Sequence, residues 1–501
     1  MKKHDILENI RIEKLIFGGS WLATASDGRK IIISGGAIPD SIVDLRIIKS
    51  KKNHLEAQIY HTVKKSPLEL DIPSNWQLYG GCKWLPIPYI KQLEIKEQQI
   101  TEAFHSLQEE TTGTMWHSII RSPDSEHYRN KVEFSWWKYI SEREWVHDDY
   151  RFGFHIQGQF DRIENCWYCV LTDEDTNCIY KDIDRLARKS NLPTYDPKTG
   201  IGFWRHLVIR RAKKTGETMI IFSVNGIFES DNIHILGSKE NILTEMVQQM
   251  TEKYKNITSV YMFENTSRAD VVQWNQILLY GEPTITDELL GLTFEIQPKS
   301  FFQVNTLGAE KLYKNVMDSI QYKWWILLDL YAGTGTIGIL LAKEFNKVYS
   351  VELVTSSSED GKKNSDRNKI KNVKFINLKV EDFSKEFSSG WGKADTIVLD
   401  PPRDGLHPSA IPHILTFGAR EIIYVSCNPA TLVRDISIML GKEMNHMTTD
   451  TDATEVTNHQ DSSAKEQLPK IQPKYRISDI TPMDMFPHTH HIETVVRLER
   501  I

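Results

Sequence analysis

The stretch from Leu327 to Gly338, LLDLYAGTGTIG, constrains the fold of this chain more than any other. An apolar run that starts at Trp324 ends there, and it is short enough for a buried parallel strand. Two glycines, Gly333 and Gly335, follow, and apolar residues then recur at helical spacing. A strand, a glycine turn and a helix form the first unit of a doubly wound sheet, which places a nucleotide-like ligand at the carboxyl end of the strand.

Acidic residues end two further predicted strands. Glu352 ends the strand over 347–353, about twenty residues after the turn, where an acid can hold ribose hydroxyls. Asp400 ends the strand over 396–400. Predicted strands over 347–353, 373–378, 396–400 and 421–426 alternate with helical segments, which predicts an α/β sheet. We interpret the glycine turn and the two acids as a pocket for S-adenosylmethionine (SAM).

Composition indicates a globular protein of a reducing compartment. The length of 501 residues predicts two or three domains. Hydrophobic residues make up 40% and charged residues 26% of the chain, as in a globular protein. We expect a cytoplasmic location, because the N-terminus lacks a secretory pattern and no run of about eighteen apolar residues predicts a membrane span. The 5 cysteines are too sparse for a disulfide framework. They lie at Cys82, Cys166, Cys169, Cys178 and Cys427.

Charge gives an ambiguous signal. The formal net charge of -6 by itself argues against a nucleic-acid protein, but the distribution of charge matters more than its sum. Basic clusters lie at 49–52, 205–214 and 362–371, and each one alone is interpreted as a solvated face.

Two domains are predicted before the α/β domain. Residues 1–66 contain five short strands, over 11–18, 21–26, 30–36, 41–50 and 54–63, with turn signals between them, as in a small OB-like barrel. Residues 67–290 mix helices and strands and form a predicted central α+β domain. Five of its side chains could stack on bases or pair with phosphates, although core packing is as good an interpretation for each: Tyr128, Arg129, Trp136, Trp137 and Phe152. The third domain is predicted over 291–501, with a polar, acidic and flexible insertion at 442–470.

Two residues near the C-terminus can carry covalent chemistry. Cys427 follows a predicted strand and precedes a helix that starts at Pro429, so the helix N-terminus should favour its thiolate. Glu493 is predicted to open the last strand. A buried core cysteine and a surface glutamate are the plainer interpretations. His488, His490 and His491 precede Glu493, but their spacing is not that of a zinc site, so no metal is expected and they are predicted to shape the loop.

A set of motifs extends these observations to a family. FFQVNT, DLYAGTGTIG, VLDPPRDGL, YVSCNPATLVRD and DMFPHTHHIETV together resemble the signatures of RNA uracil-5-methyltransferases, and the segment around DGRKIIISGG resembles the RNA-binding TRAM domain. The resemblance covers nearly the whole chain. It implies a Rossmann-like SAM-dependent methyltransferase domain in which Cys427 is the nucleophile and Glu493 the base. The residues that it implies for SAM binding are Gln303, Tyr331, Gly333, Glu352 and Asp400.

The resemblance implies formation of 5-methyluridine in RNA, with 23S-type ribosomal RNA favoured over transfer RNA because of the TRAM-like start. A methyltransferase for base amino groups is an alternative, but it usually carries N-P-P-aromatic where this chain has DPPR. An inactive RNA-binding or RNA-remodelling protein is another, and the presence of Cys427 and Glu493 argues against it.

The chain departs from the family pattern at an iron–sulfur site. Many relatives use four cysteines for a cluster, and Cys82 and Cys166 match two of them. Pro73 and Tyr79 occupy the other two positions. Because a four-iron cluster normally uses four thiolates, we expect no cluster, although Cys169 and Cys178 are further thiols in this part of the chain, so the exclusion is not complete.

Overall fold

The computed structural model describes residues 1–34, 38–73, 81–138, 150–156, 159–226, 239–267, 275–388, 392–442 and 474–501. The predicted insertion at 442–470 lies outside the described residues except for Lys442. Contacts divide the chain into two compact units. Unit 1 contains 1–99, 121–312 and 484–491, and unit 2 contains 100–120, 313–483 and 492–501. The predicted domain borders at 66 and 290 stay predictions.

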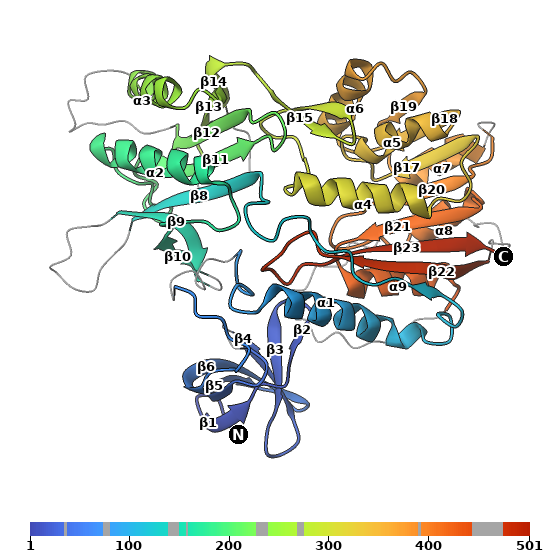
Figure 1. Cartoon of the computed structure of the whole chain (residues 1–501), viewed down its shortest axis with the longest axis horizontal. Coiled ribbons are helices and arrows are strands. Elements are labelled where there is room, and N and C mark those ends of the chain that lie inside the picture. Colours follow the sequence, from blue (N-terminus) through green and yellow to red (C-terminus); the bar gives the residue numbers. More distant parts are fainter. Residues whose placement is uncertain are drawn as a thin grey trace. The chain divides into compact units, whose positions relative to one another are not determined.

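Unit 1 begins with a six-stranded sheet in the order β1-β5-β6-β4-β3-β2, drawn in blue in Figure 1. Every second residue of β3, and of β5 as far as Ile47, is buried in a core around Trp21, as the period of a half-buried strand requires. The five predicted strands are present, and β1 is additional. Its residues are mostly exposed, so they show no alternating pattern. The strands are β1 (Ile6–Arg11), β2 (Lys14–Ile16), β3 (Ser20–Thr24), β4 (Lys30–Ser34), β5 (Ile42–Ser50) and β6 (His54–Lys64).

A seven-stranded mixed sheet forms the central part of unit 1, in the order β10-β9-β8-β11-β12-β13-β14. Helix α2 begins where the Asp173 carboxylate accepts a hydrogen bond from the Thr176 N–H, and basic residues occupy its last turn. The elements are β8 (Lys131–Lys138), β9 (Tyr150–Ile156), β10 (Gln159–Asn165), α2 (Glu174–Lys189), β11 (Trp204–Arg211), β12 (Thr218–Asn225), α3 (Lys239–Lys253), β13 (Ile257–Asn265) and β14 (Asn275–Gly281).

The hairpin β15 (Ile285–Leu289) and β16 (Leu292–Ile296) completes unit 1. The border between the units falls within helices α1 (Tyr89–Ala103) and α4 (Thr306–Ser319). On α1, Leu93 and Ile100 are buried together with Lys96. No described helix is long and apolar enough to cross a lipid bilayer.

Unit 2 is built on one sheet with the strand order β19-β18-β17-β20-β21-β23-β22-β7 (Figure 1). The first five of these strands are parallel, and β23 and β22 form an antiparallel pair beside them. The chain starts in the middle at β17 and reverses direction across the sheet between β17 and β20. This reversal is the switch point at which doubly wound sheets bind ligands.

The strands and helices of unit 2 alternate as the sequence predicted, and the parallel strands are almost wholly buried. The strands are β7 (Met115–Trp116), β17 (Ile326–Leu330), β18 (Lys347–Val351), β19 (Val373–Ile376), β20 (Thr396–Leu399), β21 (Glu421–Ser426), β22 (Tyr475–Met483) and β23 (Glu493–Arg500). The helices are η2 (Phe104–Leu107), α5 (Thr336–Leu341), η3 (Ala342–Glu344), α6 (Thr355–Arg367), α7 (Val380–Ser388), α8 (Ala410–Thr416) and α9 (Pro429–Met439).

Candidate active site

The carboxyl ends of the parallel strands carry most of the predicted site residues. Each residue follows the last residue of its strand, and parallel strands end at the same edge of a sheet. Strand β17 leads to Tyr331, β18 to Glu352, β20 to Asp400 and β21 to Cys427. The fold therefore places these four residues along one edge, on both sides of the switch point.

The turn after β17 has a backbone that few residues adopt. Tyr331, Gly333 and Gly335 have φ angles of 58°, 56° and 68°. Such a conformation is uncommon for tyrosine and is a frequent mark of a functional site. A Cβ on Gly333 would meet no atom within 4 Å, so open space lies above the turn, whereas a Cβ on Gly335 would lie 2.5 Å from the ring of Phe375. Gly333 thus leaves its backbone open to a ligand, and Gly335 is required by packing.

Two carboxylates hold this turn in place. Glu352 Oε2 accepts a hydrogen bond of 2.9 Å from the Gly333 N–H. Asp329, which the sequence analysis missed, accepts bonds of 3.0 Å from the Gly338 N–H and the Ser350 hydroxyl. Burial raises the pKa of Asp329 to about 7. An open glycine backbone beside a fixed acid suits the adenosine and methionine ends of SAM, so these residues fit the cofactor.

Gln303, the remaining predicted cofactor residue, belongs to unit 1. It lies between β16 and α4, and its carbonyl oxygen accepts a 2.9 Å hydrogen bond from Asn130 Nδ2.

Cys427 lies between β21 and α9, as predicted. Asn428 is the N-cap, and its side chain accepts a hydrogen bond from the Ala430 N–H. The expectation of a stabilised thiolate is wrong for the protein without ligands. Burial raises the pKa of Cys427 to about 11, and the charges of Glu493 and Asp400 add to this rise. Desolvation is the largest cause of this rise.

Glu493 is the first residue of β23, also as predicted. Strands β21 and β23 pair with Ser426 opposite Thr494, so Cys427 and Glu493 occupy the next position of this register. The Glu493 side chain is 6% exposed. Burial raises its pKa well above the ordinary value, the charge of Asp400 raises it further, and Arg403 opposes the rise.

Arg403 is a second residue that the sequence analysis did not single out, although it belongs to the DPPR motif. Its positive charge lowers the pKa of both Cys427 and Glu493. Its carbonyl oxygen accepts hydrogen bonds from Asn428 Nδ2 at 3.1 Å and Thr431 Oγ1 at 3.3 Å, which tie the segment after β20 to the start of α9. Asp400, three residues earlier, has a pKa of about 7 because it is buried.

The residues that precede Glu493 are held by buried polar contacts within unit 1. Lys96 Nζ donates to Asp484 Oδ1 at 2.6 Å, and neither side chain is exposed. Gln92 accepts a hydrogen bond from the His488 N–H and contacts His488 Nδ1 at 3.0 Å. His488 itself has a φ of 64°. The predicted role of this histidine in shaping the loop is consistent with these contacts.

The iron–sulfur expectation concerns the core of unit 1. Cys82, Cys166 and Cys169 are buried in one hydrophobic cluster, and Cys178 is exposed. Burial and the two neighbouring thiols raise the pKa of Cys82. Among the residues that the structure describes, no group of three potential ligands is placed to hold a metal ion, and position 79 lies outside them. Absence of a cluster stays a prediction, which iron and sulfide assays of anaerobically purified protein would test.

Three of the aromatic residues proposed to stack on bases cannot do so. Tyr128, Trp136 and Phe152 are at most 2% exposed, because they pack in the core of unit 1. Trp137 and Arg129 are half-buried. The core interpretation holds for the three buried rings.

Comparisons with known proteins identify the family of the chain. The family model "tRNA (Uracil-5-)-methyltransferase" matches residues 284–463. An uncharacterized RNA methyltransferase of Clostridium tetani is 34% identical, over 98% of this chain and 97% of its own length. Another from Clostridium acetobutylicum is 33% identical, over 100% and 99%.

A solved structure shares the fold. The tRNA (uracil-54, C5)-methyltransferase of Pyrococcus abyssi, in complex with S-adenosyl-L-homocysteine, matches with a TM-score of 0.68 and 23% identity, over 98% of this chain and 100% of that chain. The sheet order, the glycine turn and the near full-length relatives lead to one conclusion. The chain belongs to the RNA uracil-5-methyltransferase family of SAM-dependent enzymes.

Proposed function

We propose that this enzyme forms 5-methyluridine through a covalent bond between Cys427 and the uracil ring. The observation that carries the proposal is the pairing of β21 with β23, which brings Cys427 and Glu493 to neighbouring register positions. Asp400 acts electrostatically on both of these residues. A nucleophile, a carboxylate base and a second acid thus share one edge of the sheet.

Carbon 5 of uracil is a weak nucleophile, which explains the need for a thiolate. The Cys427 thiol loses its proton to solvent, and the thiolate adds to carbon 6, so that carbon 5 becomes the nucleophilic carbon of an enolate. SAM, when bound, supplies the methyl group that carbon 5 takes. Because the pKa of Cys427 is about 11, only a small fraction is thiolate at neutral pH, and we expect the rate of addition to rise with pH.

Glu493 completes the reaction as the base. Its carboxylate removes the proton from carbon 5, the double bond between carbons 5 and 6 forms again, and the carbon 6–sulfur bond breaks to release Cys427. A raised pKa makes this carboxylate a stronger base than an ordinary one, and Arg403 favours its ionised form. The target uridine must leave its helix, or be single-stranded, to reach the buried pair.

We assign SAM binding to Tyr331, Gly333, Glu352 and Asp400 of unit 2, and the role of Gln303, in unit 1, stays an expectation from the family resemblance. Glu352, already fixed by the Gly333 N–H, would hold ribose hydroxyls, and Gly333 would admit the cofactor against its backbone. Asp400 would act on the cofactor and on the uracil through its charge, which affects Asp329 beside the turn and also Cys427 and Glu493.

For the RNA we propose ribosomal RNA of the 23S type, with transfer RNA as the alternative. Support comes from the six-stranded sheet of short strands within 1–66, which contains the segment that resembles a TRAM domain in sequence. We infer that this segment and the central α+β region, 67–290, bind RNA. The solved relative from Pyrococcus abyssi is named for transfer RNA, which keeps that substrate in the test.

Mapping of 5-methyluridine in total RNA, with and without this gene, tests the proposal. Loss of 5-methyluridine at one or more ribosomal RNA positions is the expected result. Loss confined to transfer RNA would assign the alternative substrate. If no 5-methyluridine is lost, the proposed product is wrong.

A further inference from the structure

Two positive side chains face each other across neighbouring strands of unit 1. Arg210 on β11 is the register partner of Lys131 on β8. Like charges directly opposite on antiparallel strands are destabilising. Arg210 is only 6% exposed, so the prediction that residues 205–214 form a solvated face is wrong there, as it is at Arg205, which is 2% exposed.

Neither cation is neutralised by a bonded acid in the described part of the chain. The Arg210 guanidinium donates to the Ser300 carbonyl at 2.7 Å, and its buried Nε has no hydrogen-bond partner there. The Lys131 ammonium has neither a hydrogen bond nor an ion pair among these residues. Burial lowers the pKa of Lys131, the charge of Arg210 lowers it further, and only Glu133 acts in the opposite sense.

The adjacent residue shows that this imbalance is local. Arg211 forms ion pairs with Asp173 at 2.6 Å and Asp175 at 2.7 Å. In a chain with a formal net charge of -6, acids are available to pair with cations. The face that carries Arg210 and Lys131 nevertheless has no bonded acid, and that arrangement persists at a cost unless an anion binds.

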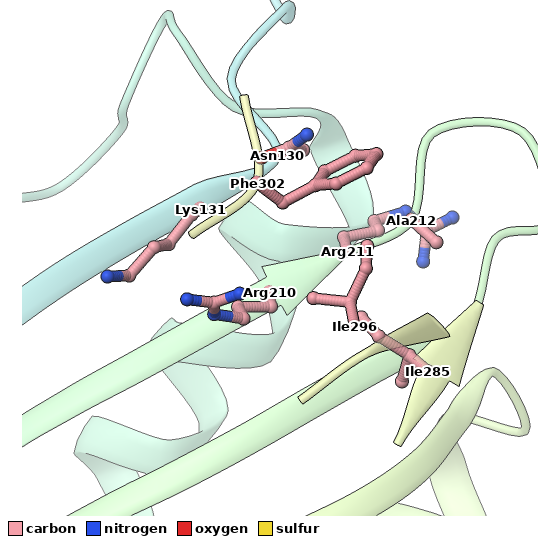
Figure 2. A pocket seen from close by; sticks show the side chains of 8 residues that line it. All are labelled: Asn130, Lys131, Arg210, Arg211, Ala212, Ile285, Ile296 and Phe302. Atoms are coloured by element: carbon pink, nitrogen blue, oxygen red, sulfur yellow. The ribbon is translucent and has the colours of Figure 1, made fainter. Parts of the chain in front are cut away.

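A small pocket lies at this face. Figure 2 shows Arg210 and Lys131 extending to one side of it, with the ring of Phe302 on another side. The pocket has a volume of about 10 Å³, which is room for about one water-sized group. It is lined by Asn130, Lys131, Arg210, Arg211, Ala212, Ile285, Ile296 and Phe302.

We propose that this pocket binds a backbone phosphate of the substrate RNA, an inference that rests on the proposed function. A phosphodiester can place one anionic oxygen between Arg210 and Lys131 while the rest of the group stays outside, as the small volume requires. Charge-assisted hydrogen bonds from both cations would hold that oxygen. The phosphate would also supply the negative charge that the cross-strand pair lacks.

The test compares salt dependence of RNA binding. We would measure the affinity of the full chain for a short fluorescein-labelled single-stranded RNA of mixed sequence, by anisotropy, between about 50 and 200 mM KCl. The variants are Lys131→Gln, Arg210→Gln and the double substitution. Lys255→Gln is the matched control, because Lys255 is exposed in the same unit and has no acid partner among the described residues. Its substitution removes the same charge.

The double variant should bind about tenfold more weakly, and its slope of log affinity against log salt should fall by about 0.7, the value for one phosphate of a single strand. The Lys255→Gln variant should keep the RNA affinity and the slope of the parent, and the affinity of the variants for SAM should also stay at the parent value.

An unchanged slope in Lys131→Gln and in the double variant overturns the inference while the proposed function stands. A loss of SAM affinity with an unchanged slope also overturns it, because the anion would then be the cofactor carboxylate. If inorganic phosphate binds to the pocket but the slope for RNA stays at the parent value, the site belongs to the free ion and the inference is wrong.

Two further measurements distinguish a folding defect of a variant from a failure of the proposed function. Thermal melting shows whether Arg210→Gln folds, and Lys131→Gln decides the question alone if it does not, since Lys131 is only half-buried. Absence of RNA binding by the parent protein would instead contradict the proposed function itself, and the phosphate assignment with it.

Discussion

Two groups of buried charges in this enzyme differ in how they are compensated. In unit 1 the Lys96 ammonium and the Asp484 carboxylate are both fully buried and bond to each other at 2.6 Å. In unit 2, Asp400 and Glu493 form no hydrogen bond or ion pair through their carboxyl groups in the described residues, and the pKa of each is raised. The Lys96–Asp484 pair holds a loop in place. The unpaired acids Asp400 and Glu493 have raised pKa values, which are typical of residues that act on a ligand.

The unpaired acids of unit 2 lower the stability of the folded state. A buried acid without a partner destabilises the folded state whenever it ionises. Natural proteins accept such violations mainly at functional sites. The contrast between the unpaired acids of unit 2 and the Lys96–Asp484 pair of unit 1 is what the following experiments test.

Substitution of Cys427 should give the largest effect. Cys427→Ala removes the nucleophile, and we expect methyl transfer to RNA to fall by at least about 10³-fold. SAM affinity should stay within about twofold of the parent, since other residues hold the cofactor. Labelled-methyl transfer and equilibrium binding measure the two quantities. Substantial turnover by the alanine variant would contradict the covalent mechanism.

Lys96→Met should lower the free energy of unfolding by about 3–5 kcal/mol, because it leaves the Asp484 carboxylate buried without its counter-charge. Replacing both residues, as Lys96→Met with Asp484→Leu, should recover much of that loss. Urea unfolding measures both. Lys91→Met is the control on the same helix, since its pair with Glu94 is exposed and should contribute less than about 1 kcal/mol. Equal effects at Lys91 and Lys96 would remove the distinction between the two pairs.

Asp400→Asn should have a smaller effect, and one that depends on pH. The folded pKa of Asp400, about 7, lies above its ordinary value of 3.8, so the folded state binds the proton more tightly than the unfolded state. Stability from this group is complete below pH 3.8 and is lost as the pH rises through 7. We expect the variant to lose less stability than the parent between about pH 5 and pH 8, as measured by thermal melting. Parallel curves of stability against pH for the two proteins would show that another group compensates the charge of Asp400.

Much of unit 2 could be predicted from the sequence. The glycine turn and the alternating strands and helices fix a doubly wound sheet. Four site residues directly follow a strand, so their position at the carboxyl edge follows from the topology: Tyr331, Glu352, Asp400 and Cys427. Glu493 could be placed because it opens the last strand of an antiparallel pair. The resemblance to a family then assigned their roles.

Features set by tertiary packing could not be predicted. The pKa of Cys427 depends on burial and on Asp400 and Glu493, which come from distant parts of the chain. Lys96 and Asp484 are separated by 388 residues, so no local pattern reports their bond. A basic run such as 205–214 has the composition of a solvated face, and only the register of β11 with β8 shows that Arg210 is turned into a pocket.

The most direct measurement is the fate of RNA on the Glu493→Gln variant. The amide retains the size of the side chain but cannot remove the carbon 5 proton, so addition and methyl transfer should occur while release fails. We predict a methylated adduct between enzyme and RNA that survives denaturing gel electrophoresis and disappears when Cys427→Ala is added. If Glu493→Gln turns over at the parent rate without an adduct, Glu493 is not the base and the account of this site is wrong.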